Sequence, residues 1–190
     1  MPRRIILAAT GASGMPYAVR LAQVLAATPD IELHLMLSEA ATNVLALESD
    51  VTAEELTALA DYSYAPSELD AGPASGSWRH DGMVICPCSM ASLAAIAHGL
   101  GANLIHRAAD VTIKERRPLV LVPRETPLST IHLTNMLTLA QTGAVILPPA
   151  PGFYHKPTTV AALVDFVVAR VLDALAIPQQ LMRGWREDAS

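Results

Sequence analysis

Charged side chains that suit phosphate chemistry are concentrated between residues 107 and 125. This stretch holds five of the chain's 13 lysines and arginines, although the net charge of the chain is −5. Its charged residues are Arg107, Asp110, Lys114, Glu115, Arg116, Arg117, Arg124 and Glu125. The spacing of Arg107, Asp110 and Lys114 (i, i+3, i+7) places them on one stripe of a helix. Converging cations favour a phosphate or diphosphate ligand; the alternative is a solvated helix face with one structural ion pair.

Arg124 and Glu125 directly follow a strand predicted over Leu119–Pro123. Ligands of open parallel sheets bind beyond the C-terminal ends of the strands, so this position favours a functional role. The loop 148–157 follows a further predicted strand and contributes the hydroxyl of Tyr154.

Arg170 shares a predicted helix face with apolar neighbours, because Phe166 and Val167 precede it by four and three residues. A charge on such a face needs a partner. Asp173, at i+3, is one candidate partner and a ligand phosphate is the other.

Two segments rich in small or hydroxyl residues join predicted strands to predicted helices. Residues 10–14 offer backbone N–H groups and the Ser13 hydroxyl to an anion such as phosphate, or form a tight turn with a helix cap. Residues 86–92 place hydroxyls in the first turn of a helix, where they suit a phosphate or a ring edge. The alternative there is that Ser89 is a plain N-cap beside small, buried cysteines.

Cys86 and Cys88 are separated by one proline. A disulfide across that spacing would be strained, and two sulfurs alone do not form a zinc site. We therefore expect a reduced, cytoplasmic protein.

The elements that must position these residues alternate between short apolar strands and helices, the pattern of a parallel sheet covered on both faces. Strands are predicted at 5–9, 31–37, 83–86, 119–123 and 145–147. Helices are predicted at 15–27, 39–47, 53–60, 90–98, 105–115, 129–141 and 158–175, with residues 61–79 as one long surface loop. We therefore predict an α/β fold with a doubly wound parallel sheet. A single domain would span residues 1–190, with a C-terminal tail from about residue 178.

Composition narrows the function further. Of 190 residues, 52% are apolar and 16% are charged, which excludes intrinsic disorder. The acidic balance argues against a nucleic-acid binder, and no apolar run is long enough to span a membrane. A typical domain is about 25% charged, so we expect some outer faces to be buried in an oligomer.

Together these segments resemble the UbiX family of flavin prenyltransferases, in order from Arg3 to about Trp185. The resemblance is carried by residues 10–14 (TGASG), 73–77 (PASGS), 83–89 (MVICPCS), 107–111 (RAADV), 114–121 (KERRPLVL), 124–128 (RETPL) and 143–157 (GAVILPPAPGFYHKP). It implies a Rossmann-like, homo-oligomeric flavoprotein fold, typically a dodecamer built from trimers.

The resemblance also implies a reaction without a metal. A dimethylallyl group passes from dimethylallyl phosphate to N5 of reduced FMN, and closure at C6 adds a fourth ring. The prenylated FMN serves a UbiD-type decarboxylase, for example in ubiquinone biosynthesis.

Residue roles follow from the resemblance. Positions that match FMN contacts are Gly11, Ala12, Ser13, Ser38, Ser89, Met90, Ala91, Ser92 and Arg124. Positions that match prenyl-phosphate contacts are Arg107, Lys114, Tyr154 and Arg170. The implied catalytic residues are Glu48, near the reacting flavin, with Ser13 and Glu125 in proton handling. The released phosphate, oriented by Glu125 and Ser13, would then remove the C6 proton.

One departure concerns the shielding of the flavin. Some members carry a Trp just before the PASGS segment, whereas residues 67–71 contain none. Trp185 or a neighbouring subunit would then provide this cover.

Other interpretations stay open. FMN-dependent cysteine decarboxylases share the fold but rely on a catalytic His and an Asn-rich loop. Direct decarboxylation of an aromatic acid, or a non-enzymatic role as a flavin-binding subunit of such a decarboxylase, are further alternatives. A pure scaffold would not need Arg124, Glu125, Lys114 and Arg170 to converge, which favours the prenyltransferase.

Overall fold

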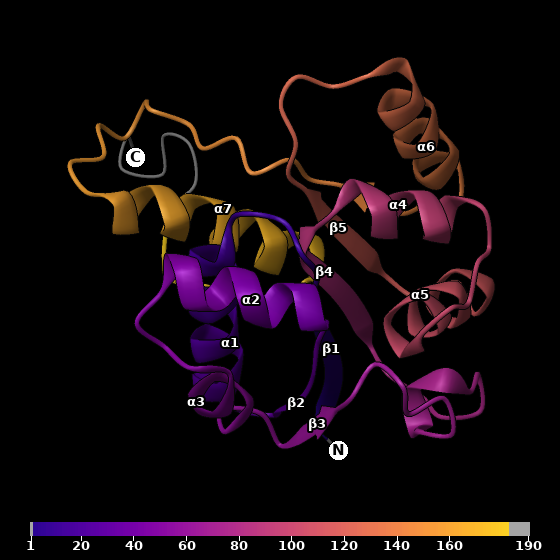
Figure 1. Cartoon of the computed structure of the whole chain (residues 1–190). Coiled ribbons are helices and arrows are strands. Elements are labelled where there is room, and N and C mark those ends of the chain that lie inside the picture. The colour runs from indigo at the N-terminus through magenta and orange to yellow at the C-terminus, as the bar shows by residue number, and fades with distance from the viewer. Residues whose placement is uncertain (1, 183–190) are drawn as a thin grey trace.

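The computed structural model describes residues 2–182 (Figure 1). Within these residues, parallel strands form one sheet in the order β3-β2-β1-β4-β5-β6. The strands are β1 (Arg3–Ala9), β2 (Ile31–Leu37), β3 (Tyr62–Tyr64), β4 (Gly82–Cys88), β5 (Leu119–Pro123) and β6 (Val145–Ile146). This is the strand order of Rossmann dinucleotide-binding sheets. The predicted fold class is therefore confirmed.

Helices cover both faces of the sheet (Figure 1). One face carries α1 (Met15–Ala27), α2 (Glu39–Glu48) and α7 (Val160–Ala174), with α3 (Ala53–Thr57) after α2. The other carries α4 (Met90–Ala97), α5 (Leu104–Lys114) and α6 (Thr130–Gln141). Successive residues of a strand point to opposite faces. Accordingly, Ile5 and Leu7 of β1 pack in the first core cluster, and Ile6 and Ala8 in the second.

The segment 61–79 is not the plain surface loop that the sequence predicted. It contains β3 and a short 3-10 helix, η1 (Gly72–Ala74), and its Ala71, Ala74 and Trp78 pack against the second core cluster. The sequence Tyr-Ser-Tyr of β3 shows no apolar run, because the strand lies at the sheet edge and is half exposed. Pairing with β2, rather than its own pattern, holds it in the sheet.

The strand order reverses between β1 and β4, which are adjacent in the sheet. Thr10, only 2% exposed, ties the two strand ends together at this switch point. Its Oγ1 accepts a hydrogen bond from the Ser89 backbone N–H at 2.7 Å and donates to the Pro87 carbonyl at 3.1 Å. The crevice at which such folds bind ligands is therefore formed by residues 10–14 and 89–92.

Within residues 2–182, no helix is long and apolar enough to cross a membrane. The predicted C-terminal tail falls partly outside the described residues, and Trp185 lies outside them.

Candidate functional site

Glu48 occupies the anion position at the start of α1. Its Oε2 accepts hydrogen bonds from the backbone N–H groups of Gly14 (2.8 Å) and Met15 (2.9 Å). The sequence left open whether residues 10–14 bind a phosphate or form a tight turn with a capped helix, and in this structure the Glu48 carboxylate accepts from the two N–H groups at the end of this turn. The first N–H groups of a helix lack partners within the helix and attract negative charge, and a carboxylate 34 residues away satisfies them.

Ser13 links Glu48 to Arg124. Burial raises the pKa of Glu48, but hydrogen bonds from the Ser13 side chain and the Gly14 and Met15 backbone outweigh it, and the charge of Arg124 adds to them. The pKa of Glu48 is thus held below its ordinary value. The Arg124 Nε in turn donates to the Ser13 carbonyl at 3.2 Å. Three residues assigned by resemblance, the carboxylate Glu48, the hydroxyl residue Ser13 and the cation Arg124, therefore meet at the switch point.

The two glycines of residues 10–14 have structural reasons to be glycine. A Cβ on Gly11 would collide with the Ala40 Cβ at the start of α2. Gly14 has a φ of 121°, in the region that side chains disfavour. Their spacing therefore reflects the close packing of this loop on α2 as well as any approach to a ligand. Ala12 lies between them and is buried.

Serine hydroxyls begin the two helices that follow β2 and β4. Ser38 caps α2 by accepting from the Ala41 N–H at 3.0 Å, and Ser89 caps α4 by accepting from the Ser92 N–H at 3.2 Å. Both are N-caps, and for Ser89 this was the alternative that the sequence offered. The N–H groups of Met90 and Ala91 lie in the first turn of α4, where helices leave donors unpaired.

His106 contacts Ser92 of the switch point, although the sequence analysis did not single it out. It lies on α5 and is buried (9% exposed), and its Nε2 is 3.3 Å from the Ser92 Oγ. Its Nδ1 is buried without a hydrogen-bond partner among the described residues, and burial lowers the pKa of the ring. A histidine 14 residues from its serine gave no signal in the sequence.

Glu125 follows Arg124 at the end of β5 and is exposed. Its Oε1 accepts from the neighbouring Thr126 N–H at 2.9 Å. The residues around the switch point thus form one group, which we name the switch-point group. Its members are Gly11, Ala12, Ser13, Ser38, Glu48, Ser89, Met90, Ala91, Ser92, Arg124 and Glu125.

The predicted phosphate-binding cations do not converge within one chain. Arg107 pairs with Asp110 at 2.7 Å, and Lys114 pairs with Glu115. Both lie on α5, and Arg107 also donates to the carbonyl of Ala74, in the segment that precedes β4. Lys114 ends α5 shortly before β5 begins, near the N-terminal ends of the strands, whereas the switch point lies at their C-terminal ends. Arg107 and Lys114 form the α5 group.

Tyr154 and Arg170 form a third group, the α7 group. The Tyr154 ring lies edge-on to Phe166, with centroids 5.9 Å apart. Arg170 lines a cavity of about 480 Å³ together with Phe166. Its guanidinium is exposed and pairs with Asp173 at 2.8 Å, so the partner within the same helix is present. Arg170 does share a face with Phe166 and Val167, as predicted, and Asp173 is the partner that this structure provides.

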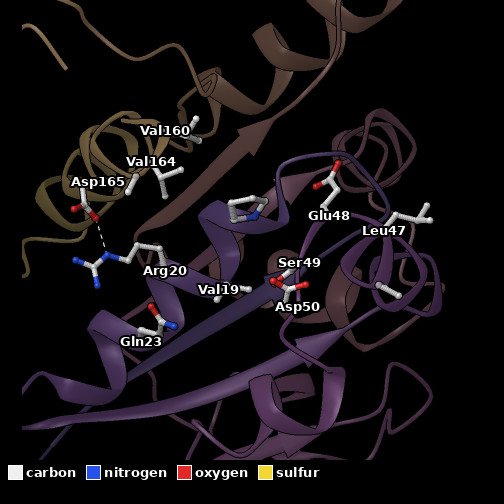
Figure 2. A pocket seen from close by; sticks show the side chains of 13 residues that line it. Val19, Arg20, Gln23, Leu47, Glu48, Ser49, Asp50, Val160, Val164 and Asp165 are labelled. Atoms are coloured by element: carbon white, nitrogen blue, oxygen red, sulfur yellow. Dashed lines mark hydrogen bonds and ion pairs between the residues drawn. The ribbon is translucent and has the colours of Figure 1, made fainter. Parts of the chain in front are cut away.

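A cavity of about 760 Å³ opens beside Glu48, between α1, the end of α2 and the start of α7 (Figure 2). An ion pair between Arg20 and Asp165, at 2.6 Å, joins α1 to α7 across its wall. Leu47 and Val160 on its lining are 85% and 73% exposed. Both are large apolar side chains that face solvent in the single chain.

The donor set of the switch-point group fits FMN. A flavin mononucleotide needs a site for its phosphate and donors for its ring edge. The starts of α2 and α4 offer serine hydroxyls and first-turn N–H groups, Arg124 offers a cation, and the His106 Nδ1 is an unpaired buried atom beside them. Serines and helix N-termini are the groups that bind phosphates in such folds.

Cys86 and Cys88 lie in β4, directly before this group, and both are buried free thiols. Burial raises the pKa of Cys86 far above its ordinary value, and that of Cys88 to about 12. The thiols are therefore protonated near neutral pH, which argues against a cysteine nucleophile.

Comparison with known proteins identifies relatives over nearly the whole chain. The family model described as Flavoprotein matches residues 1–172. Flavin prenyltransferase LpdB of Lactiplantibacillus plantarum is 51% identical over 186 residues, covering 98% of this chain and 100% of the relative. Flavin prenyltransferase UbiX of Pseudomonas aeruginosa is 51% identical over 200 residues, covering 98% of this chain and 95% of the relative.

Solved structures of UbiX-type proteins also match nearly the whole chain. A crystal structure of AnUbiX (PadA1) in complex with FMN and dimethylallyl pyrophosphate has a TM-score of 0.95 at 44% identity, covering 97% of this chain and 98% of that one. A dodecameric FMN-dependent UbiX-like decarboxylase from Escherichia coli O157:H7 has a TM-score of 0.94 at 48% identity, covering 96% and 98%. The cysteine decarboxylase TvaF, at 18% identity and a TM-score of 0.64, shares the fold alone.

Fold and site therefore define the class: the chain belongs to the Flavoprotein family. Within it, the chain is a member of the UbiX family of flavin prenyltransferases. The family membership predicted from the sequence is confirmed.

Proposed function

We propose that this chain is a flavin prenyltransferase that transfers the dimethylallyl group of dimethylallyl phosphate to N5 and C6 of reduced FMN. The observation that carries the proposal is the Ser13–Glu48–Arg124 cluster at the switch point. It occurs in a chain that is 51% identical to a flavin prenyltransferase over nearly its full length.

FMN would be held by the switch-point group, and its reduced ring would supply the nucleophilic N5 and C6. Gly11, Ala12, Ser13, Ser38, Ser89, Met90, Ala91, Ser92 and Arg124 are the proposed FMN-binding residues. Glu48 is ionised near neutral pH because its pKa is lowered. A fixed carboxylate in this position stabilises the positive charge that develops on the allylic carbons as phosphate leaves.

The prenyl phosphate would be bound by Arg107, Lys114, Tyr154 and Arg170. These residues belong to the α5 and α7 groups. The α5 helix ends near the N-terminal ends of the strands, whereas Glu48 lies at their C-terminal ends. We therefore propose that each site is assembled from more than one subunit of a homo-oligomer, a dodecamer built from trimers. Support comes from the dodecameric relative and from exposed apolar side chains such as Leu47, Ile131 and Val160.

Proton handling would fall to Glu125 and Ser13. Glu125 is exposed at the end of β5, where it can orient the released phosphate as the base for the C6 proton. The reaction needs no metal in this proposal.

The domain organisation, the cellular compartment and the recipient of the product are also proposals. The whole chain would act as one flavoprotein domain, supported by the single continuous sheet and the match over residues 1–172. Its free thiols support a reducing compartment such as the cytoplasm. The prenylated FMN would pass to a UbiD-type decarboxylase, as in ubiquinone biosynthesis.

The test is direct. Anaerobic protein, reduced FMN and dimethylallyl phosphate should yield a flavin heavier by one five-carbon unit, detected by mass spectrometry. Glu125→Gln should bind FMN normally yet stall before this product forms. Recovery of unmodified FMN alone, where a known flavin prenyltransferase succeeds, would contradict the proposed function. Unchanged product formation by Glu125→Gln would contradict the role of Glu125.

A further inference from the structure

Two arginines hold the backbone of residues 72–78. The Arg107 Nε donates to the Ala74 carbonyl at 3.1 Å. Arg117, just beyond α5, donates from Nη2 to the Gly76 carbonyl at 2.8 Å and from Nη1 to the Trp78 carbonyl at 3.0 Å. Loop carbonyls usually face water, whereas these three accept from fixed guanidinium groups.

Arg117 is itself fixed by a chain of hydrogen bonds that runs through the neutral His80 ring. Its Nη1 lies 2.9 Å from the His80 Nδ1, and because arginine only donates, Nδ1 accepts and Nε2 carries the proton. Nε2 then donates to the Thr112 Oγ1 at 2.9 Å, and that hydroxyl donates to the Ala108 carbonyl at 2.6 Å. His80 and Thr112 are 4% and 0% exposed, so this chain joins the segment to α5 away from water.

Trp78 holds the other side of residues 72–78 by packing against Arg4 and His34. The Arg4 guanidinium lies 5.1 Å from the centroid of its ring, and the His34 ring meets it edge-on at 4.8 Å. A Cβ on Gly72 would come within 2.8 Å of the same ring. Trp78 therefore folds back over its own segment near the start of β1, and does not reach the switch point of its own chain.

The two cations of the α5 group rest on this segment. Arg107 is bound to Ala74, as described above. The Lys114–Glu115 pair packs against the backbone of Gly76, where a Cβ would lie 2.7 Å from the Lys114 Nζ. The positions of both cations therefore depend on the conformation of residues 72–78.

We propose that residues 72–78, Arg107 and Lys114 form one preorganised unit, the α5 arm, and that Arg117 and His80 are its positioning residues. The arm presents its cations to an allylic phosphate at a neighbouring subunit's switch point. This inference rests on the proposed function, and it adds two residues that act through Arg107 and Lys114 rather than by touching substrate. Preorganised cations bind a phosphate without a further ordering cost.

Arg117→Lys tests the proposal, because lysine keeps the charge but cannot bridge two carbonyls and an imidazole. The KM for dimethylallyl phosphate should rise about tenfold, while the Kd for FMN stays unchanged. Arg116→Lys, at an exposed neighbour, is the matched control and should leave both constants unchanged. A loss of kcat with an unchanged KM would show a purely structural role and overturn the proposal.

Variants of His80 and of two glycines test the same proposal independently. His80→Asn retains an acceptor for Arg117 and should rescue most of the effect seen in His80→Leu. Gly76→Ala should displace Lys114 and raise the same KM, whereas Gly101→Ala, which meets no atom within 4 Å, should not. Equal KM values for dimethylallyl phosphate in His80→Asn and His80→Leu would contradict the proposed α5 arm. An unaltered KM in Gly76→Ala would also contradict it.

A binding measurement separates this proposal from the proposed function. Calorimetric titration of the assembled, flavin-free protein with inorganic phosphate requires no turnover. Arg117→Lys should weaken this binding relative to wild type and Arg116→Lys. Equal affinity in all three proteins would overturn the α5 arm, whereas absence of prenylated flavin from wild type would overturn the proposed function alone.

Discussion

At the scale of single residues, Glu48 serves a helix other than its own. It is the last residue of α2, where a negative charge opposes the helix dipole. Its carboxylate instead completes the start of α1 through Gly14 and Met15. No local pattern indicates such a contact, so the sequence identified Glu48 only through the family resemblance.

Glu48→Gln should lower the free energy of unfolding by about 1 kcal/mol, because a neutral amide is a weaker partner for the α1 N-terminus. A depressed pKa contributes stability above the ordinary glutamate value, and this stability is lost as the pH falls through the folded-state pKa. Urea unfolding of the flavin-free protein should therefore show a difference that shrinks on acidification. Asp70→Asn, at an exposed carboxylate outside the helices, is the control, and a gap that persists in acid would contradict this account.

His80 should make stability depend on pH in mildly acidic solution. Burial and the nearby Arg117 lower its pKa from 6.5 to about 4. Between these values the unfolded chain binds more protons, so stability falls as the pH drops from 6.5 towards 4, by up to about 3 kcal/mol. His80→Asn should remove this component while those of His34 and His106 remain. Unfolding measured from pH 7 to 5 should thus show a shallower slope, and identical slopes would argue against the neutral, buried state of His80.

At the scale of elements, the sequence predicted most of the fold because each element carries its own signals. The apolar strands occur as predicted, and Ser38, Ser89 and the Thr52–Glu55 capping box mark the starts of their helices. Arg107 and Asp110 share a helix stripe, as predicted, and form the ion pair that was the alternative to a phosphate site. What could not be predicted depends on distant partners: the edge strand β3, the support of residues 72–78, and the separation of the α5 group from the switch point.

Two N-cap variants should separate helix stability from flavin binding. Ser89 caps α4 at the switch point, and Ser129 caps α6 away from it. Ser89→Ala and Ser129→Ala should each cost about 1 kcal/mol of unfolding free energy. Only Ser89→Ala should also weaken FMN, measured by quenching of flavin fluorescence. Equal flavin affinity in both variants would remove Ser89 from the proposed FMN site.

At the scale of the whole molecule, a single chain holds every proposed residue and yet does not hold a complete site. The switch-point group lies at the C-terminal ends of the strands, whereas α5 ends near their N-terminal ends (Figure 1). In the proposed function, symmetric assembly would resolve this, because each subunit would give its α5 arm to one neighbour and receive an arm from another. Oligomer formation would then be a requirement for activity.

Mixing inactive variants tests this shared site. Arg107→Ala and Glu125→Gln, co-expressed at equal amounts, should recover activity in about a quarter of the sites, where both contributing subunits are intact. Co-expressed Arg107→Ala and Lys114→Ala should recover none, because every arm carries one defect. Activity in the second mixture, or none in the first, would contradict a site shared in this way.

The burial of Cys86 and Cys88 has a consequence for the lifetime of the enzyme. An allylic phosphate that ionises produces an electrophile, and a thiolate beside it would be alkylated in preference to weaker nucleophiles. Both thiols stand at the end of β4, next to the proposed reaction, but they are shielded and their raised pKa values keep them protonated. The same packing that builds the central strand thus protects the catalyst from inactivation by its own substrate.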